Sequence, residues 1–242
     1  AGMNGFVAGV SGGIDSAVTS SLCAKTGRKV ILLNMPIYQK PGQISLSARH
    51  IDSLSETYRN VTGVKVDLTP PFQALGKTLP ERIQDPHTMA NTRARMRMLT
   101  LYAFAAHHRM LVAGTGNKVE DFGIGFYTKF GDGGVDLSPI ADLKKTEVYA
   151  LGKELGVMGD ILNAPPTDGL WEDSRTDEDQ IGASYEELEW AMDFEKAPSD
   201  ENKLAARHKE VLAIYRRFHQ ANLHKMLPIP VCIIPDILRQ DD

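Results

Sequence analysis

The sequence has few cysteines, no long apolar run and no long basic stretch, and each shortage argues against a class of protein. Its two cysteines, Cys23 and Cys232, form no Cys-x-x-Cys pair, which predicts a reducing compartment, the cytoplasm. No apolar run reaches 18 residues, so we expect no membrane span. A net charge of −4 argues against broad nucleic-acid binding.

The 242 residues alternate instead between strand-like and helix-like segments. The patterns predict strands at 6–10, 29–35, 64–68 and 110–113. They predict helices at 16–25, 45–60, 91–108, 145–157 and 200–218. Continuous apolar strands separated by helices favour an α/β fold, a doubly wound parallel sheet with helices on both faces. We expect residues 1–242 to form a single domain with a trimmed N-terminus and no signal peptide.

The glycine-rich turn after the first predicted strand is the strongest functional signal. Its pattern is Gly9-x-Ser11-Gly12-Gly13-x-Asp15-Ser16. Gly12 and Gly13 permit a positive φ and let a ligand approach the backbone closely. The N–H groups of the turn and the positive end of the next helix converge on the same position. This geometry favours a bound phosphate. Asp15 would repel that phosphate unless a divalent metal ion lies between them. The alternative is a plain Ser-Gly-Gly turn.

Further polar residues follow a later strand. Glu120 comes after the strand at 110–113, so we expect it at the same edge of the sheet as Asp15. Two carboxylates there, with ATP oxygens and water, would suit Mg²⁺. Thr115 is placed to bond a phosphate or ribose, and a lysine of the Lys144-Lys145 pair to balance triphosphate charge. The alternatives are a solvated helix start at Glu120 and a solvated helix face at the lysine pair.

These motifs resemble those of one enzyme family. The glycine-rich turn resembles the pyrophosphate loop of the N-type ATP pyrophosphatases, and it lacks the Gly-Lys-Ser/Thr of the Walker type. The segments that narrow the resemblance are 114–120, Lys129-Phe-Gly-Asp-Gly-Gly-Val-Asp136, 143–145, Pro166-Thr167, 171–179 and His224-Lys225. Over residues 5–228 the chain resembles the ammonia-dependent NAD synthetases, whose fold is of the adenine nucleotide α-hydrolase type.

The resemblance implies a role for each matching residue. The pyrophosphate loop would bind ATP through Gly9, Val10, Ser11, Gly12, Gly13, Ile14, Asp15 and Ser16. Further ATP contacts are implied for Arg97, Thr115, Lys145 and Thr167. Contacts to deamido-NAD are implied for Arg95, Lys129, Asp132, Asp136, His224 and Lys225. Asp15 and Glu120 match the Mg²⁺ ligands, and Asp15 and Lys145 would be catalytic.

The implied reaction has two steps. The carboxylate of deamido-NAD attacks the α-phosphorus of ATP and releases pyrophosphate, and ammonia then displaces AMP to give NAD. Such a site needs positioning and charge stabilisation rather than a covalent nucleophile, and the sequence offers no Ser-His-Asp or Cys-His set. We expect residues 163–181 to be a lid. We expect small-molecule substrates only, a homodimer, and neither nucleic-acid nor membrane binding.

Two other functions remain open on the sequence. The first is that of another N-type ATP pyrophosphatase, such as a tRNA-thiolating or GMP-synthetase-like enzyme. Thiolating enzymes generally need reactive cysteines and a basic RNA surface, and this sequence shows neither. Alternatively it would be a non-catalytic adenine-nucleotide sensor, which has no need of Asp15, Glu120 and Lys145 together.

Overall fold

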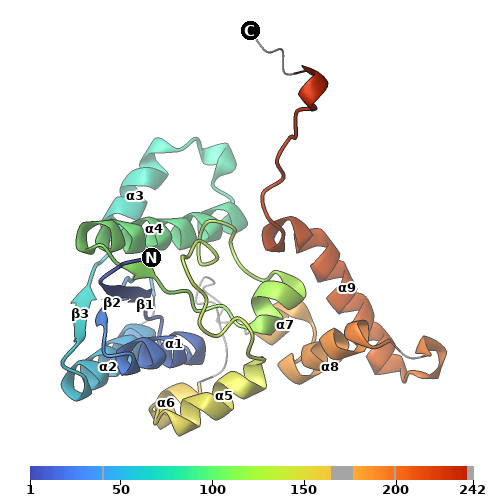
Figure 1. The fold of residues 1–242 in the computed structure, drawn as a ribbon, viewed down its shortest axis with the longest axis horizontal. Coiled ribbons are helices and arrows are strands. Elements are labelled where there is room, and N and C mark those ends of the chain that lie inside the picture. The colour runs from blue at the N-terminus through green and yellow to red at the C-terminus, as the bar shows by residue number, and fades with distance from the viewer. Residues whose placement is uncertain (40, 165–176, 199, 239–242) are drawn as a thin grey trace.

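The computed structural model describes residues 1–39, 41–164, 177–198 and 200–238. At its centre is a parallel sheet in the order β3-β2-β1-β4 (Figure 1). The strands are β1 (Gly5–Gly9), β2 (Lys29–Asn34), β3 (Val61–Lys65) and β4 (Leu111–Val112). Phe6 pairs with both Val30 and Leu111. The chain first winds from β1 to β3 and then returns to the other side of β1, so the winding reverses between β1 and β4.

Helices cover both faces of this sheet, as the sequence predicts (Figure 1). One face carries α1 (Ile14–Lys25) and α2 (Pro41–Thr57), and the other carries α3 (Thr69–Thr78) and α4 (Pro86–His108). Successive strand residues point to opposite faces. Ala8 and Leu32 therefore pack in the cluster of Cys23 and Ile51, while Val7 and Leu33 pack in the cluster of Phe72 and Ala105.

Several element bounds differ from the predicted ones. β3 begins three residues early, because Val61 to Lys65 pair in register with Val30 to Asn34 of β2, which outweighs the weak strand pattern of Thr62 and Gly63. Residues 69–71 are the first turn of α3, where a proline is tolerated because its missing N–H is needed by no helical bond. α2 begins at Pro41, four residues before the predicted start at residue 45, and ends at Thr57. A short 3₁₀ turn, η1 (Glu81–Ile83), leads to α4.

The rest of the chain packs beside the sheet. α5 (Lys145–Glu154) and α6 (Gly159–Leu162) bury apolar residues against α1. A second cluster joins the π-helix η2 (Lys118–Ile124), α7 (Asp177–Ile181), α8 (Tyr185–Lys196) and α9 (Ala206–Met226). The segment at 200–205 forms a separate 3₁₀ turn, η3 (Glu201–Lys203), capped by Asp200, so α9 begins later than predicted.

The chain beyond α9 leaves the body of the molecule (Figure 1). It runs from Leu227 to the short turn η4 (Asp236–Leu238) and exposes Ile229, Val231 and Ile233 by 65, 80 and 83%. In the part of the chain that the structure describes, no helix has the length and apolar composition needed to cross a bilayer. Cys23 is buried, and burial raises its pKa to about 11.

Candidate active site

The glycine-rich loop joins β1 to α1 at the carboxyl edge of the sheet. Gly12 has φ +94°, and a Cβ at this position would lie 3.2 Å from the carbonyl oxygen of Gln43 on α2. Ser16 Oγ donates to the Gly13 carbonyl at 2.9 Å and accepts from the Ser11 N–H at 3.2 Å. The hydroxyl of Ser16 therefore stabilises the loop itself, while Ser11 and Gly13 are exposed to solvent.

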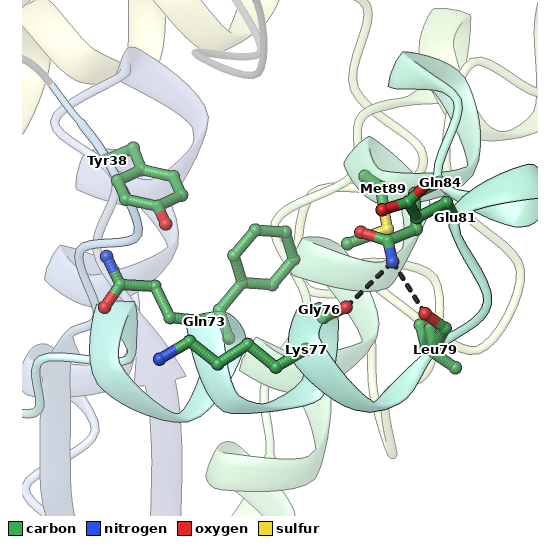
Figure 2. A pocket seen from close by; sticks show the side chains of 9 residues that line it. Tyr38, Gln73, Gly76, Lys77, Leu79, Glu81, Gln84 and Met89 are labelled. Carbon is green, nitrogen blue, oxygen red and sulfur yellow. Dashed lines mark hydrogen bonds between the residues drawn. The ribbon is translucent and has the colours of Figure 1, made fainter.

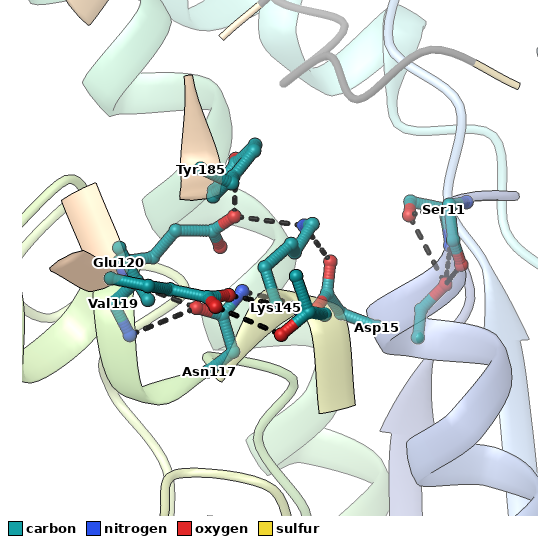
Figure 3. Close-up of polar contacts among 11 residues, drawn as sticks. Ser11, Asp15, Asn117, Val119, Glu120, Lys145 and Tyr185 are labelled. Carbon is teal, nitrogen blue, oxygen red and sulfur yellow. Dashed lines mark hydrogen bonds and ion pairs between the residues drawn. The ribbon is translucent and has the colours of Figure 1, made fainter. Parts of the chain in front are cut away.

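Asp15, Glu120 and Lys145 come together beside this loop (Figure 3). Lys145 Nζ lies 2.6 Å from Asp15 Oδ2 and 2.9 Å from Glu120 Oε1. The Lys145 side chain is 4% exposed, and the two carboxylates are 18 and 17% exposed. Asp15 follows β1 and Glu120 follows β4, so this carboxylate–lysine cluster lies where the winding of the sheet reverses. Ligands of open α/β sheets bind at that position.

The charges of the carboxylate–lysine cluster perturb one another. Burial raises the pKa of Asp15, with Lys145 opposing it and Glu120 reinforcing it. Burial also acts to raise the pKa of Glu120, but the charge of Lys145 and the hydrogen bond from Tyr185 lower it overall. Burial, together with the charges of Glu120, Asp132 and Asp15, raises the pKa of Asp121 to about 8. Two carboxylates thus face a single ammonium group, and a cation bound beside them would favour the ionised form of both.

Local structure on two elements places these side chains. Asn117, fully buried, accepts hydrogen bonds from the N–H groups of Val119 and Glu120 at 3.1 Å and so caps η2. Its amide also donates to Asp15 Oδ1 at 3.1 Å. At the start of α5, Thr146 donates from its N–H and its hydroxyl to the buried Glu189 of α8, at 2.9 and 2.8 Å. The Asn117 bonds fix the backbone at Glu120, and the Thr146 bonds fix the backbone next to Lys145.

Sequence reasoning missed two residues of this site, Asn117 and Tyr185. The hydroxyl of Tyr185 donates to Glu120 Oε1 at 2.6 Å from a helix 65 residues further along the chain. Nothing local in the sequence marks such a contact. Asn117 did carry a signal, because Asn is a favoured cap and precedes an acidic helical turn.

The residues predicted to bind the dinucleotide lie around the loop 125–136, at the end of α9 and on α4. Lys225 donates to the carbonyls of Gly125 and Tyr127 at 2.9 and 2.7 Å, and Lys129 donates to the carbonyl of His224. These contacts join α9 to the loop. The ligand roles of Lys129, His224 and Lys225 stay predictions.

The two predicted aspartates hold the same loop. Asp132 accepts from the Thr128 N–H at 3.0 Å. Asp136 accepts from Tyr102 at 3.1 Å and from the Val112 N–H at 2.8 Å, which ties the loop to β4. Both carboxylates are therefore engaged by the protein, and their contacts to a substrate stay predictions.

The remaining predicted residues lie on α4 and near β4. Arg95 donates to the Lys129 carbonyl at 3.3 Å, and Arg97 donates to the Met35 carbonyl at 3.1 Å. Burial lowers the pKa of Arg97 to about 10, and one of its nitrogens, Nη2, is buried without a hydrogen bond among the described residues. Thr115 is half-buried between β4 and η2. Thr167 and most of the predicted lid, residues 165–176, lie outside the described residues.

A cavity of about 610 Å³ opens between Tyr38, α3 and the start of α4 (Figure 2). The rings of Tyr38 and Phe72 meet edge to face, with centroids 5.8 Å apart. The side chains of Gln73 and Lys77 extend from α3 beside them, and none of the residues predicted to bind ATP or the dinucleotide lines this cavity. The cavity and the carboxylate–lysine cluster therefore share no residue.

A family model and curated relatives both match this chain over most of its length. Residues 1–228 match the model of the NAD synthase family. The NH(3)-dependent NAD(+) synthetase of Carboxydothermus hydrogenoformans is 40% identical over 195 residues, which cover 78% of this chain and 76% of that protein. The protein of the same name from Sulfolobus acidocaldarius is 36% identical over 245 residues, covering 98% and 83%.

Solved structures agree. A structure named as NMN synthetase from Francisella tularensis has a TM-score of 0.80 and 33% identity, and the match covers 97% of this chain and 90% of that one. The NH3-dependent NAD synthetase of Campylobacter jejuni has a TM-score of 0.77 at 24% identity, with 96% and 91% covered, and supports the fold. On these matches, the chain belongs to the NAD synthase family.

Proposed function

We propose that this chain amidates deamido-NAD to NAD with ammonia and ATP, releasing AMP and pyrophosphate. The observation that carries the proposal is the carboxylate–lysine cluster of Asp15, Glu120 and Lys145 beside the glycine loop. The family to which the chain belongs supports it, as do relatives named for this activity. A mere nucleotide sensor has no need for two carboxylates next to its phosphate site.

We propose Mg²⁺ as the metal ion that accompanies ATP. Asp15 and Glu120 are close enough to share one ammonium group, so both carboxylates lie within reach of a single cation. Among the described residues no three His, Cys, Asp or Glu side chains converge, so the protein would supply this pair, with phosphate oxygens and water completing the shell. Bound there, Mg²⁺ would neutralise charge on the phosphates.

The residues of this chain would then position ATP and stabilise charge. The loop from Gly9 to Ser16 would receive the β- and γ-phosphates on its N–H groups and the positive end of α1. Lys145 would stabilise the charge that develops at the α-phosphorus as the acceptor carboxylate attacks. Ammonia then replaces AMP. Excluding water from the adenylated acid is the role we propose for residues 163–181.

A mononucleotide acceptor is the second candidate. The structure named as an NMN synthetase has the TM-score of 0.80, and its product would come from nicotinic acid mononucleotide by the same amidation. Competition between equal concentrations of the two acids decides this point. We expect the dinucleotide to be amidated faster. If the mononucleotide is amidated faster, then the mononucleotide is the substrate in place of deamido-NAD.

The function is tested by incubating the protein with ATP, Mg²⁺, ammonium and deamido-NAD. We expect NAD and AMP in equal amounts. Asp15→Asn should lower the rate at least about 100-fold without changing the circular dichroism spectrum, because it removes one of the two carboxylates that we propose hold Mg²⁺ against the phosphates. AMP formed with another acceptor only would support a different N-type pyrophosphatase, and nucleotide binding without AMP would support a sensor.

We also propose a cytoplasmic homodimer that acts as a single-domain unit. The extended stretch after α9 supports the dimer, since it exposes by 46 to 83% six large apolar residues, Leu227, Ile229, Val231, Ile233, Ile234 and Leu238. An apolar segment of this kind marks a protein contact. Sedimentation of the full chain should give twice its mass, and a monomer at micromolar concentration would contradict the proposal.

A further inference from the structure

Tyr185 contacts two members of the carboxylate–lysine cluster. It is the first residue of α8 and is 4% exposed. Its hydroxyl donates to Glu120 Oε1 at 2.6 Å, and its ring centroid lies 4.7 Å from Lys145 Nζ (Figure 3). Lys145 donates to the same Oε1 atom at 2.9 Å. Tyr185 therefore touches both partners of one buried ion pair.

The backbone of Tyr185 is fixed from α7. Glu178 Oε1 accepts a hydrogen bond from the Tyr185 N–H at 3.0 Å. The carbonyl of Glu178 accepts from the Gly182 N–H at 2.8 Å, where α7 ends. A capping box between Ser184 and Glu187 starts α8 at this point. The position of Tyr185 thus depends on α7 through the Glu178 side chain.

Binding a triphosphate would disturb the ion pair that Tyr185 touches. The ammonium of Lys145 has three donors, and Asp15 and Glu120 use two of them. A phosphate oxygen that approaches Lys145 competes with these carboxylates. A buried carboxylate that loses its partner is costly, and the Tyr185 hydroxyl keeps Glu120 bonded and oriented when that happens. The ring meanwhile offers its face to the ammonium.

We propose that Tyr185 is a positioning residue for the ATP-dependent half of the reaction, holding Glu120 and Lys145 in place as the triphosphate binds, with Glu178 holding Tyr185. The inference rests on the proposed function, because it concerns ATP at the same carboxylate–lysine cluster. It concerns the ATP site and leaves the binding of the acceptor acid unchanged.

The test uses Tyr185→Phe, which keeps the ring and removes the hydroxyl. Calorimetry measures binding of α,β-methylene-ATP in the presence of Mg²⁺, which needs no turnover. We expect the affinity to fall roughly tenfold or more, as for a lost hydrogen bond to a charged group. In steady-state assays kcat/KM for ATP should fall by a similar factor, while KM for deamido-NAD changes less than about twofold.

Two further sets of variants separate positioning from general packing. Tyr215→Phe removes a hydroxyl from a tyrosine that is similarly buried and stacked on His219, and it should leave nucleotide affinity unchanged. Glu178→Ala should weaken binding of the analogue, whereas Glu178→Gln keeps an oxygen that accepts from the Tyr185 N–H and should restore it.

Unchanged affinity in Tyr185→Phe, or an equal loss in Tyr215→Phe, overturns the inference. A failure of the proposed function is distinguishable from this outcome. If the wild-type protein binds the analogue and forms no NAD, the proposed function fails, while the binding comparison still decides the role of Tyr185.

Discussion

Replacing Lys145 by Met should destabilise the protein as well as inactivate it. Met has nearly the length and apolar stem of Lys but no charge. Its introduction leaves Asp15 and Glu120 facing each other without the cation that both contact, at 2.6 and 2.9 Å. We therefore expect the free energy of unfolding to fall at neutral pH, and AMP formation to be lost.

The size of the loss follows from the geometry. At an effective dielectric constant of about 20, each contact contributes roughly 6 kcal/mol of Coulomb attraction, most of which offsets the cost of taking the charges out of water. Removing one partner of a buried ion pair costs about 3–5 kcal/mol. The carboxylates are 17 and 18% exposed, so solvent screens part of the effect and we expect about 3 kcal/mol.

The loss of unfolding free energy is measured by urea denaturation of four proteins: wild type, Lys145→Met, Glu120→Gln and the double variant. Glu120→Gln removes one of the two charges that Lys145 balances. The double variant should therefore lose less unfolding free energy than the two single variants lose together, by about 1.5 kcal/mol or more. Strict additivity, or a Lys145→Met protein as stable as wild type, would refute the electrostatic account of this cluster.

Two other predictions concern the scaffold. Gly12→Ala should cost about 2 kcal/mol of unfolding free energy in urea denaturation, because Gly12 has φ +94° and the added Cβ would lie 3.2 Å from Gln43. Gly13→Ala is the control. Gly13 has φ −89° and the nearest atom to its added Cβ is 3.5 Å away, so this variant should cost under about 0.5 kcal/mol. His50 is buried and its Nε2 lies 2.9 Å from Ser20 Oγ, and burial lowers its pKa from 6.5 to about 4. The unfolded chain then binds more protons between these two values, so stability should fall by up to about 3 kcal/mol as the pH drops from 6.5 to 4. His50→Gln should abolish most of this dependence in thermal unfolding, and an unchanged pH profile would show that another group titrates.

Local sequence signals predicted the part of the fold that carries the phosphate loop. The apolar run of β1, the glycines and the apolar helix α1 are contiguous, so β1, the loop and the helix were each predictable from neighbouring residues. The shared edge of Asp15 and Glu120 also followed from strand order alone. The structure confirms that the two carboxylates meet, and Lys145 lies between them.

Features that depend on distant contacts were not predictable. The π-helix η2 is held at its end by α9, where His219 and Asn222 bond the carbonyls of Gly123 and Ile124 at 2.7 and 2.9 Å. Those partners are about 100 residues away, and no local pattern indicates them. The same limit applies to Tyr185. The roles of Arg95 and Arg97, and of the segment 163–181 as a lid, stay predictions.

The choice of an amide at position 117 has a consequence for the lifetime of the protein. Aspartate at this position would have nearly the same shape, and its oxygens would still accept the two N–H groups of η2. The face toward Asp15 would then carry a second acceptor in place of a donor. Spontaneous hydrolysis of this one amide would therefore set two largely buried carboxylates against each other and turn a contact that holds the site together into a repulsive one.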